Sequence, residues 1–291
     1  MDKLPIHKEK TQLTALLGSP VAHSISPAMH NEAFKQLGLD YVYRAFDVNE
    51  NELAKAVDQL KNIGIRGFNL TMPNKNKIVE LLDHLSPAAK LIGAVNTVVN
   101  DGGILTGYNT DGIGFIQSLR DIDFDITGKE ITILGNGGAA TAIIAQAALD
   151  GAHTINIFAR PNSRFAKRMA KLVADINNTT KATACVYDLA DTSKLRDAIS
   201  SSTLLVNATS VGMSPNTDAS PVEAANVFHT NLLVADIIYE PKTTKLLQLA
   251  SESGCKTCNG LYMLLHQGAA AFKLFTGHDM PVELIRHKFF Q

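Results

Sequence analysis

A glycine-rich turn between a strand and a helix constrains the fold of this chain more than any other feature. Residues 130–134 form an apolar run typical of a buried strand, and residues 142–149 form an alanine-rich helical stretch. Between them, Gly135-x-Gly137-x-x-Ala140 has the spacing of a dinucleotide-binding fingerprint. The glycines permit a tight turn and a close approach to a pyrophosphate, and Ala140 permits close helix packing. We therefore expect phosphates to bind at this helix N-terminus.

The end of the following strand, residues 154–159, predicts which dinucleotide binds. An acidic residue at this point would bind the ribose 2′-hydroxyl, whereas an arginine accommodates a 2′-phosphate. The chain has no acid there and carries Arg160 and Arg164 instead. The sequence therefore favours NADP over NAD, although a solvent-exposed Arg164 without a ligand is the simpler interpretation of that side chain.

Strands and helices alternate along most of the chain. The second half has expected strands at residues 130–134, 154–159, 182–187, 204–208 and 233–238, separated by helical segments. The first half has expected strands at residues 13–18, 41–48 and 65–70 and a hairpin over residues 94–107. Such alternation indicates an α/β fold, with a parallel sheet and helical crossovers in the second half. The turn-rich residues 108–112 mark the boundary between the halves.

Polar side chains gather where the strand at residues 65–70 ends. Asn69 and Thr71 lie two residues apart, so their side chains point to the same face of an extended chain. Pro73 lacks an N–H donor and ends the ladder, and Lys75 follows in the turn. This segment suits a small polar ligand and a proton carrier. A strand exit with a solvated lysine is the simpler interpretation.

Charge and composition exclude several kinds of partner. The net charge of −1 favours neither nucleic acid nor an anionic membrane. The polar N-terminus has no apolar signal core, and no run approaches the roughly 18–20 apolar residues of a membrane span. We therefore expect a cytoplasmic protein. Cys255-x-x-Cys258 lacks the two further ligands that zinc requires, so we expect three buried thiols and no metal.

Several motifs resemble those of the shikimate dehydrogenases, and together they cover most of the chain. They are Gly18–Pro27 with His30-Asn31, Gly67–Lys75, Gly93–Thr97 with Tyr108–Gly112, Asn207–Met213, and Gly260–Gly268. Residues 72–75 and 87–93 are most similar to the quinate/shikimate dehydrogenase branch, whose members use NAD or NADP.

The resemblance implies two α/β domains with the active site in the cleft between them. Residues 1–111, completed by C-terminal helices in 261–291, would bind substrate, and residues 112–260 would form a Rossmann-type doubly wound parallel-sheet domain for NAD(P). The implied reaction is reversible NAD(P)H-dependent reduction of 3-dehydroshikimate to shikimate, a step of aromatic amino acid biosynthesis. The expected partners are small molecules, and the expected state is a monomer or homodimer.

Lys75 and Asp111 match the catalytic pair of the family. Hydride addition to a ketone leaves an alkoxide, and a lysine ammonium can supply the proton that it needs. A neighbouring carboxylate favours the charged form of the lysine. Two roles for Lys75 stay open, proton transfer and stabilisation of the developing charge. Asp111 also suits a helix N-cap.

The resemblance assigns further residues to each ligand. Ser24 and Ser26 match carboxylate-binding serines, and Ser26 before Pro27 is also a good N-cap. Asn69, Thr71, Asn96 and Gln267 match positions that bind substrate hydroxyls, and Tyr239 matches a tyrosine near the substrate. The cofactor set is Gly135, Asn136, Gly137, Gly138, Ala139, Ala140, Arg160, Arg164, Thr209, Met213 and Gly260. For His23 and His30 we expect structural roles.

Two alternative functions remain at this level. A quinate or dual quinate/shikimate dehydrogenase would accept a further hydroxyl on the carbon that bears the carboxylate, near Ser24, Thr71 and Gln267. A non-catalytic sensor of nucleotide or metabolite is also compatible with the fold. Such a sensor would not need Lys75 and Asp111, and both are present.

Overall fold

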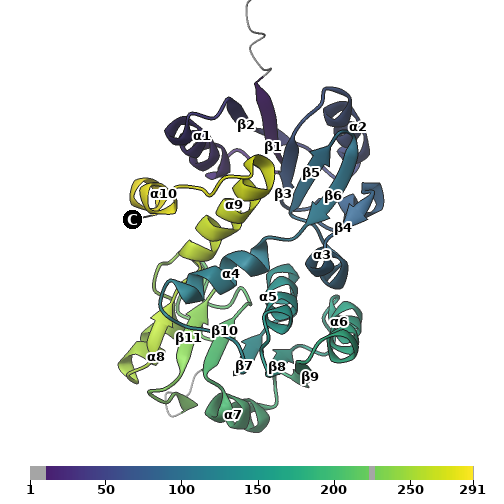
Figure 1. The fold of residues 1–291 in the computed structure, drawn as a ribbon. Coiled ribbons are helices and arrows are strands. Elements are labelled where there is room, and N and C mark those ends of the chain that lie inside the picture. The colour runs from purple at the N-terminus through teal and green to yellow at the C-terminus, as the bar shows by residue number, and fades with distance from the viewer. Residues whose placement is uncertain (1–10, 223–226, 291) are drawn as a thin grey trace, which may run out of the picture.

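The computed structural model describes residues 11–222 and 227–290, which form two six-stranded sheets surrounded by helices (Figure 1). The first sheet contains β1 (Gln12–Gly18), β2 (Tyr41–Asp47), β3 (Gly67–Leu70), β4 (His84–Leu85), β5 (Thr97–Asp101) and β6 (Ile104–Tyr108). Their order is β2-β1-β3-β5-β6-β4, with β5 antiparallel to both β3 and β6. The expected hairpin is therefore confirmed as β5 and β6.

Both faces of the first sheet are covered by helices. The helices and the 3-10 turn that precede the second sheet are α1 (Ser26–Leu37), α2 (Leu53–Asn62), η1 (Lys77–Leu81), α3 (Pro87–Ile92) and α4 (Asp111–Arg120). Alternate residues of β1 point to opposite faces. Leu16 joins a core with α1, whereas Ala15 and Leu17 join a separate core with α2.

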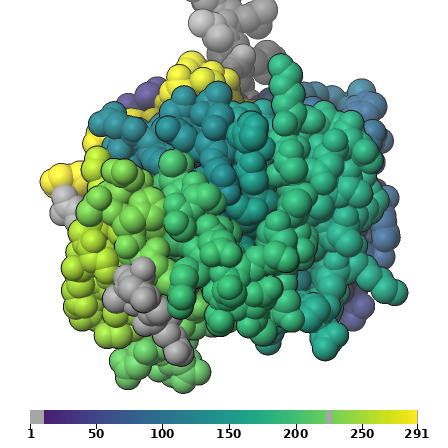
Figure 2. Space-filling view, turned by 90° about the horizontal axis from the view of Figure 1, so that it is seen from below, coloured from purple at the N-terminus to yellow at the C-terminus, as the bar shows by residue number. Residues whose placement is uncertain are grey.

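The second sheet is entirely parallel. It contains β7 (Glu130–Leu134), β8 (Thr154–Ala159), β9 (Thr183–Asp188), β10 (Leu204–Asn207), β11 (Leu233–Asp236) and β12 (Lys256–Cys258). The helices between them are α5 (Gly138–Leu149), α6 (Ala166–Thr179), α7 (Thr192–Ser201) and α8 (Lys245–Glu252). Figure 2 shows the end of the molecule built by this half of the chain, in teal to yellow-green.

The order β12-β11-β10-β7-β8-β9 is that of a doubly wound nucleotide-binding sheet. The strand order reverses between β7 and β10, and ligands of such sheets bind beyond the carboxyl ends of the strands at this switch point. The predicted Rossmann-type fold is confirmed.

The C-terminal helices return to the first sheet. These are α9 (Leu261–Thr276) and α10 (Val282–Phe289), and Figure 1 shows α9 in yellow running from the second sheet up to the first. Phe272 and Phe275 of α9 lie in the same core as Phe34 of α1 and Tyr43 of β2. A Cβ at Gly114 of α4 would lie 2.5 Å from a backbone nitrogen of α9, so the two helices pack backbone to backbone.

Some expectations from sequence are wrong in detail. Ser26 is not the N-cap of α1, because Ile25 holds that position and the Ser26 backbone N–H donates to Ser24 Oγ at 3.3 Å. Asp111 is the first residue of α4 and Thr110 is its N-cap. Only Cys255 is buried, since the strand and loop edges leave Cys185 and Cys258 partly exposed.

The remaining differences concern short elements and ends. β4 and β12 have two and three residues, too few to give a periodic pattern. The helix expected from residue 51 begins at Leu53, and the one expected over residues 77–82 is a 3-10 turn. Within the described ranges, no helix is long and apolar enough to cross a membrane.

Candidate active site

Lys75 and Asp111 form an ion pair at the carboxyl end of β3. Lys75 Nζ lies 2.6 Å from Asp111 Oδ2, and the two side chains are 31% and 16% exposed. Lys75 lies in the turn between β3 and η1, and Asp111 begins α4. A carboxylate in the first turn of a helix is stabilised by the helix dipole. The pair is therefore shielded by protein but still open to a ligand.

The second oxygen of Asp111 is held by Asn96. Asn96 Nδ2 donates to Asp111 Oδ1 at 2.8 Å and to Thr110 Oγ1 at 2.9 Å. Asn96 Oδ1 accepts from the Thr110 backbone N–H at 2.8 Å. Asn96 is buried, and its amide hydrogen bonds lie within the protein. Its observed partners fix the carboxylate of Asp111 in one orientation.

Asn69 is also surrounded by protein partners. Its Nδ2 donates to Asn96 O at 3.1 Å and to Thr97 Oγ1 at 2.9 Å, and its Oδ1 accepts from the Tyr43 hydroxyl at 2.9 Å. Both N–H groups of this amide are thus used inside the protein. Sequence reasoning did not single out Tyr43, Thr97 or Thr110, although Thr97 and Thr110 stand inside the quoted motifs.

The loop with Ser24 and Ser26 is fixed next to the β3 exit. The backbone N–H of Ser19 donates to Met72 O at 2.9 Å, and a Cβ at Gly18 would collide with the Thr71 side chain. This close contact needs glycine at residue 18 and holds the serine loop beside Thr71. His23 in the same loop is exposed, so it is not a core residue, whereas His30 of α1 is buried.

Gln267 approaches from α9. Its Nε2 donates to Leu264 O at 3.0 Å, and its backbone packs on Gly114 of α4. Gly260 is the N-cap of α9, and a Cβ there would collide with the carbonyl of Ile237. Both contacts fix the start of α9 against its neighbours.

The glycine-rich turn lines a cavity of about 830 Å³ at the switch point of the second sheet. Its walls include Gly135, Asn136, Gly137, Arg160, Ser163, Arg164, Ala208 and Thr209. Gly135 has a φ of +113°, and a Cβ there would lie 2.7 Å from Ala208 O, so glycine is required. A Cβ at Gly138 would meet no atom of the described residues within 4 Å, which leaves open space at the N-terminus of α5. Ala139 lies in this first helical turn and Ala140 is buried against the sheet.

This cavity fits a dinucleotide by the chemistry of its walls. Asn136 Nδ2 is buried and has no hydrogen-bond partner among the described residues, while its Oδ1 accepts from Ser163 Oγ at 3.1 Å. A buried donor without a partner at a cavity wall suits an acceptor on a ligand. Arg160 and Arg164 are exposed, and within the described ranges no carboxylate forms an ion pair with either.

Arg168 is a further cation close to the first turns of α5, and sequence reasoning did not identify it. It donates from Nη2 to Thr141 Oγ1 in the first turns of α5 at 2.9 Å. Burial lowers the pKa of this guanidinium, although it remains charged at neutral pH. The contact between Arg168 and α5 could be predicted only from the packing of α6 against α5.

Asn207 organises the loop after β10. Its Oδ1 accepts from Thr209 Oγ1 at 2.7 Å, and its Nδ2 donates to the Asp236 carboxylate, which also accepts from Thr244 Oγ1 at 2.7 Å. Burial raises the pKa of Asp236, and these hydrogen bonds oppose the shift. Further along the two loops, Met213 is 47% exposed and Tyr239 is 51% exposed. These large side chains are available to a ligand.

Asp111 begins a helix, α4, that packs against α5, the helix after the glycine-rich turn. Gly112 follows Asp111 directly, and a Cβ there would collide with Ala142 O and lie 2.6 Å from the Gln146 side chain of α5. The residue after Asp111 thus packs directly against α5, and the N-terminus of α5 borders the dinucleotide cavity.

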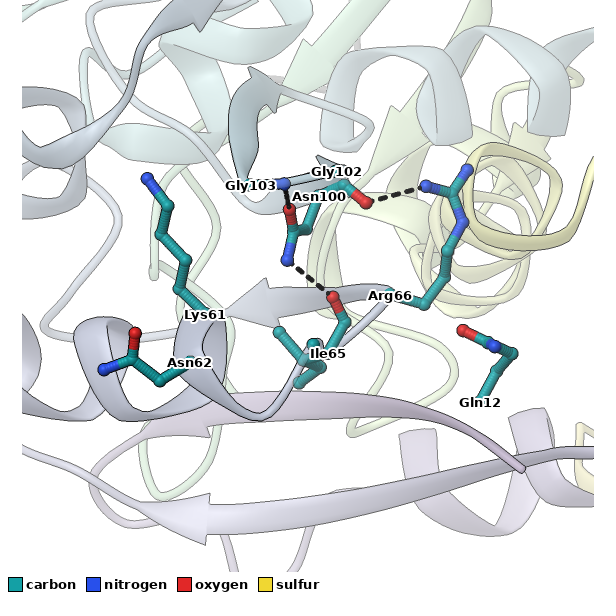
Figure 3. A pocket seen from close by; sticks show the side chains of 9 residues that line it. Gln12, Lys61, Asn62, Ile65, Arg66, Asn100, Gly102 and Gly103 are labelled. Atoms are coloured by element: carbon teal, nitrogen blue, oxygen red, sulfur yellow. Dashed lines mark hydrogen bonds between the residues drawn. The ribbon is translucent and has the colours of Figure 1, made fainter. Parts of the chain in front are cut away.

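A second, polar cavity of about 400 Å³ lies elsewhere (Figure 3). It is found at the amino ends of β1 and β3, whereas Lys75 follows the carboxyl end of β3. Its polar groups bind one another: Asn100 Nδ2 donates to Ile65 O at 2.8 Å, and the Gly103 N–H donates to Asn100 Oδ1 at 2.7 Å. We therefore exclude it as the catalytic site. In the described part of the chain, no cluster of His, Cys, Asp or Glu could hold a metal ion.

Comparisons with known proteins agree along nearly the whole chain. Residues 16–98 match the family model of the shikimate dehydrogenase substrate binding domain, and residues 260–288 match that of the shikimate 5'-dehydrogenase C-terminal domain. The curated shikimate dehydrogenase (NADP(+)) of Listeria monocytogenes is 48% identical over 280 residues, 96% of either protein.

Solved structures give the same result. Shikimate 5-dehydrogenase from Listeria monocytogenes, in complex with shikimate and NAD, superposes with a TM-score of 0.94 at 48% identity, covering 96% of each chain. Quinate dehydrogenase from Corynebacterium glutamicum, in complex with NAD, superposes with a TM-score of 0.84 at 30% identity, covering 96% of this chain and 98% of its own.

Proposed function

This chain belongs to the shikimate dehydrogenase family, and we propose that it interconverts 3-dehydroshikimate and shikimate with NADP(H). The observation that best supports the reaction is the Lys75–Asp111 pair, 2.6 Å apart. Asp111 begins α4, which packs against the helix that follows the glycine-rich turn. This arrangement supports a proton source on the side of the first sheet that packs against the dinucleotide-binding half.

The chain's own residues manage the proton. NADPH, when bound in the cavity at the glycine-rich turn, would supply the hydride for the ketone carbon. Lys75 then gives a proton to the developing alkoxide, or holds that negative charge until water does so. Asp111 keeps Lys75 charged and in place with one oxygen, while Asn96 holds the other oxygen. In the oxidation direction, Lys75 must first lose its proton to solvent, and the neutral amine then accepts the proton of the substrate hydroxyl.

The remaining polar residues suit a hydroxylated ring that carries a carboxylate. Ser24 and Ser26 bind the carboxylate, and Thr71 and Gln267 bind ring hydroxyls from the sides of β3 and α9. Tyr239 closes the site from the loop after β11. Asn69 and Asn96 act on the substrate chiefly by holding their neighbours, because their amides already have protein partners.

We also propose the division of labour between the two halves. Residues 1–111 with helices from residues 261–291 form the substrate-binding domain, and residues 112–260 form the dinucleotide-binding domain. The packing of α9 on the first sheet supports this assignment. The proposed setting is the cytoplasm, as a monomer or homodimer that acts on small molecules, without nucleic acid or membrane partners.

The arginines at the end of β8 favour NADP. Arg160, Ser163 and Arg164 line the dinucleotide cavity, and none of the described residues that line it is acidic. A 2′-phosphate would therefore meet positive charge and a hydroxyl there. NAD is the alternative, since the related Listeria structure holds NAD.

A quinate dehydrogenase is the second candidate, because the quinate enzyme of Corynebacterium glutamicum shares 30% identity with this chain. The deciding experiment is a spectrophotometric assay of shikimate and quinate, each with NADP and with NAD. We expect the highest kcat/KM for shikimate with NADP. A higher value for quinate would reverse the substrate assignment. Turnover of neither compound, with nucleotide binding intact by calorimetry, would indicate a sensor.

A further inference from the structure

Tyr43 on β2 is the far end of a buried hydrogen-bonded chain that leads to the catalytic carboxylate. Its hydroxyl donates to Asn69 Oδ1 at 2.9 Å, and Asn69 Nδ2 donates to Thr97 Oγ1 at 2.9 Å. Thr97 Oγ1 donates in turn to Asn96 Oδ1 at 2.9 Å, and Asn96 Nδ2 donates to Asp111 Oδ1 at 2.8 Å. The chain thus crosses from β2 to the start of α4.

All four hydrogen bonds point in the same direction. Each hydroxyl or amide of the chain accepts on one side and donates on the other, and the carboxylate of Asp111 can only accept. Hydrogen bonds aligned in this way polarise one another in a medium of low dielectric constant. Removal of the first donor is therefore expected to weaken the last bond, which fixes Asp111.

Tyr43 is itself held firmly by the His30-Asn31 pair of α1. The His30 ring stacks on the Tyr43 ring with a centroid distance of 4.4 Å and an interplanar angle of 18°. Asn31 Nδ2 donates to Tyr43 O at 2.9 Å, and Asn31 Oδ1 accepts from the Tyr43 N–H at 2.8 Å. The ring and the backbone of Tyr43 are thus both fixed.

Burial keeps both stacked rings neutral. It lowers the pKa of His30 to about 3, so the imidazole carries no charge at neutral pH. It raises the pKa of Tyr43 far above its ordinary value, and a hydrogen bond with Ser26 opposes this shift only in part. The Tyr43 hydroxyl therefore remains a protonated donor.

We propose that Tyr43 is a positioning residue for the reaction, which orients the Asp111 carboxylate, and through it Lys75, by way of Asn69, Thr97 and Asn96. This inference rests on the proposed function, because its effect is measured on that reaction. The proposal also assigns a structural role to His30 and Asn31, since both fix Tyr43 at the start of the hydrogen-bonded chain.

The test removes one hydroxyl and keeps the ring. Tyr43→Phe should lower kcat about three- to tenfold, the effect of one hydrogen bond. KM for shikimate should change less than kcat, because the Tyr43 hydroxyl reaches the proposed substrate site only through its hydrogen bond with Ser26. Tyr41→Phe is the matched control, because Tyr41 lies on the same strand and its hydroxyl donates at 3.4 Å to Phe275 O, outside the hydrogen-bonded chain. Equal kcat values for the two variants would overturn the proposal.

Thr97 provides a second, independent test, because it lies in the middle of the hydrogen-bonded chain. Thr97→Val removes the hydroxyl and keeps the shape, and should reproduce the loss of kcat, whereas Thr97→Ser keeps the hydroxyl and should restore most of it. Equal losses in both variants would indicate packing alone and contradict the proposal. The two Thr97 variants also test the hydrogen-bonded chain if Tyr43→Phe does not fold.

A double-mutant cycle tests whether Tyr43 and Thr97 act in series. The losses from Tyr43→Phe and Thr97→Val should not add, because either substitution already interrupts the chain. Additive losses would mean two unrelated effects and would overturn the proposal. The proposed function fails separately, if the wild-type protein oxidises no shikimate, whereas this inference fails only with an active wild type and an unaffected Tyr43→Phe.

Discussion

Lys75 and Asp111 are 36 residues apart in sequence, and Lys75 Nζ lies 2.6 Å from Asp111 Oδ2. The turn after β3 supplies the lysine and the start of α4 supplies the carboxylate, so the pair forms only when the first sheet is complete. Since Asn96 holds the other oxygen of the carboxylate, the lysine has one preferred position. Under the proposed function, this arrangement would preorganise the ammonium group for a developing alkoxide.

Substitution of the lysine should therefore abolish most of the reaction. Lys75→Ala should lower kcat about 100- to 10,000-fold with little change in KM, because the lost interaction is made mainly in the transition state. Steady-state kinetics with shikimate measures this effect. Lys77→Ala is the matched control, since Lys77 is an exposed lysine paired with Glu80, and it should leave kcat unchanged. Near-normal kcat in Lys75→Ala would contradict the catalytic assignment.

Lys75→Arg separates the two roles of the lysine. Arginine keeps the positive charge but does not release its proton in proteins. If Lys75 transfers a proton, this variant should be almost as slow as Lys75→Ala. If Lys75 only stabilises charge, Lys75→Arg should keep a large share of the activity.

Arg160 should decide the preference between the two dinucleotides. Arg160→Ala should weaken NADPH binding about ten- to a hundredfold, the effect of losing charge-assisted hydrogen bonds to a phosphate, and change NADH binding less than twofold. Fluorescence titration of each nucleotide measures both values. Lys171→Ala on the exposed face of α6 is the control. Equal losses for NADPH and NADH would place the 2′-phosphate elsewhere.

The sequence predicts the dinucleotide half better than the substrate half. The glycine spacing, the strand run before it and the helix after it are local, so they predict the strand, turn and helix directly. The hydrogen-bonded chain from Tyr43 to Asp111 depends on the strand order β2-β1-β3-β5, which no local pattern contains. Thr97 and Asn69 face each other only because β5 is antiparallel to β3.

The N-cap predicted from local sequence at the start of α1 is wrong. Ser26 before Pro27 has the composition of a helix cap, but Ser24 accepts the N–H of Ser26 and the helix starts at Ser26 itself. Neither serine caps the helix, because Ile25 holds the N-cap position. The close contacts at Gly112 and Gly114 of α4 could not be predicted from local sequence either, because they are made with helices far away in the sequence.

Gly114 should be intolerant of even one methyl group. Alanine usually stabilises a helix relative to glycine, but here its Cβ would lie 2.5 Å from Gln267 N and 2.6 Å from Met263 O. Gly114→Ala should therefore cost about 1–3 kcal/mol of stability through overpacking of α4 against α9. Urea unfolding measures the loss. The control is Ile113→Ala on the same helix, since Ile113 is 41% exposed. Unchanged stability of Gly114→Ala would mean that the two helices separate easily.

His30 should make the fold sensitive to acid. Its pKa is about 3 in the folded protein and near 6.5 when unfolded, so between these values the unfolded state binds more protons. Stability therefore falls as the pH drops from about 6.5 toward 3, by up to about 1.4 kcal/mol per pH unit from this one group. The effect is absent above pH 7.

Replacement of His30 by a ring that does not titrate should remove this component. His30→Phe keeps a ring to stack on Tyr43, and its free energy of unfolding should fall less steeply than that of the wild type between pH 6.5 and pH 4. Urea unfolding at several pH values measures both slopes, and the difference between them cancels the contribution of the carboxylates. His287→Phe on the exposed face of α10 is the control and should follow the wild-type slope. Identical slopes for His30→Phe and the wild type would mean that His30 is protonated inside the folded protein.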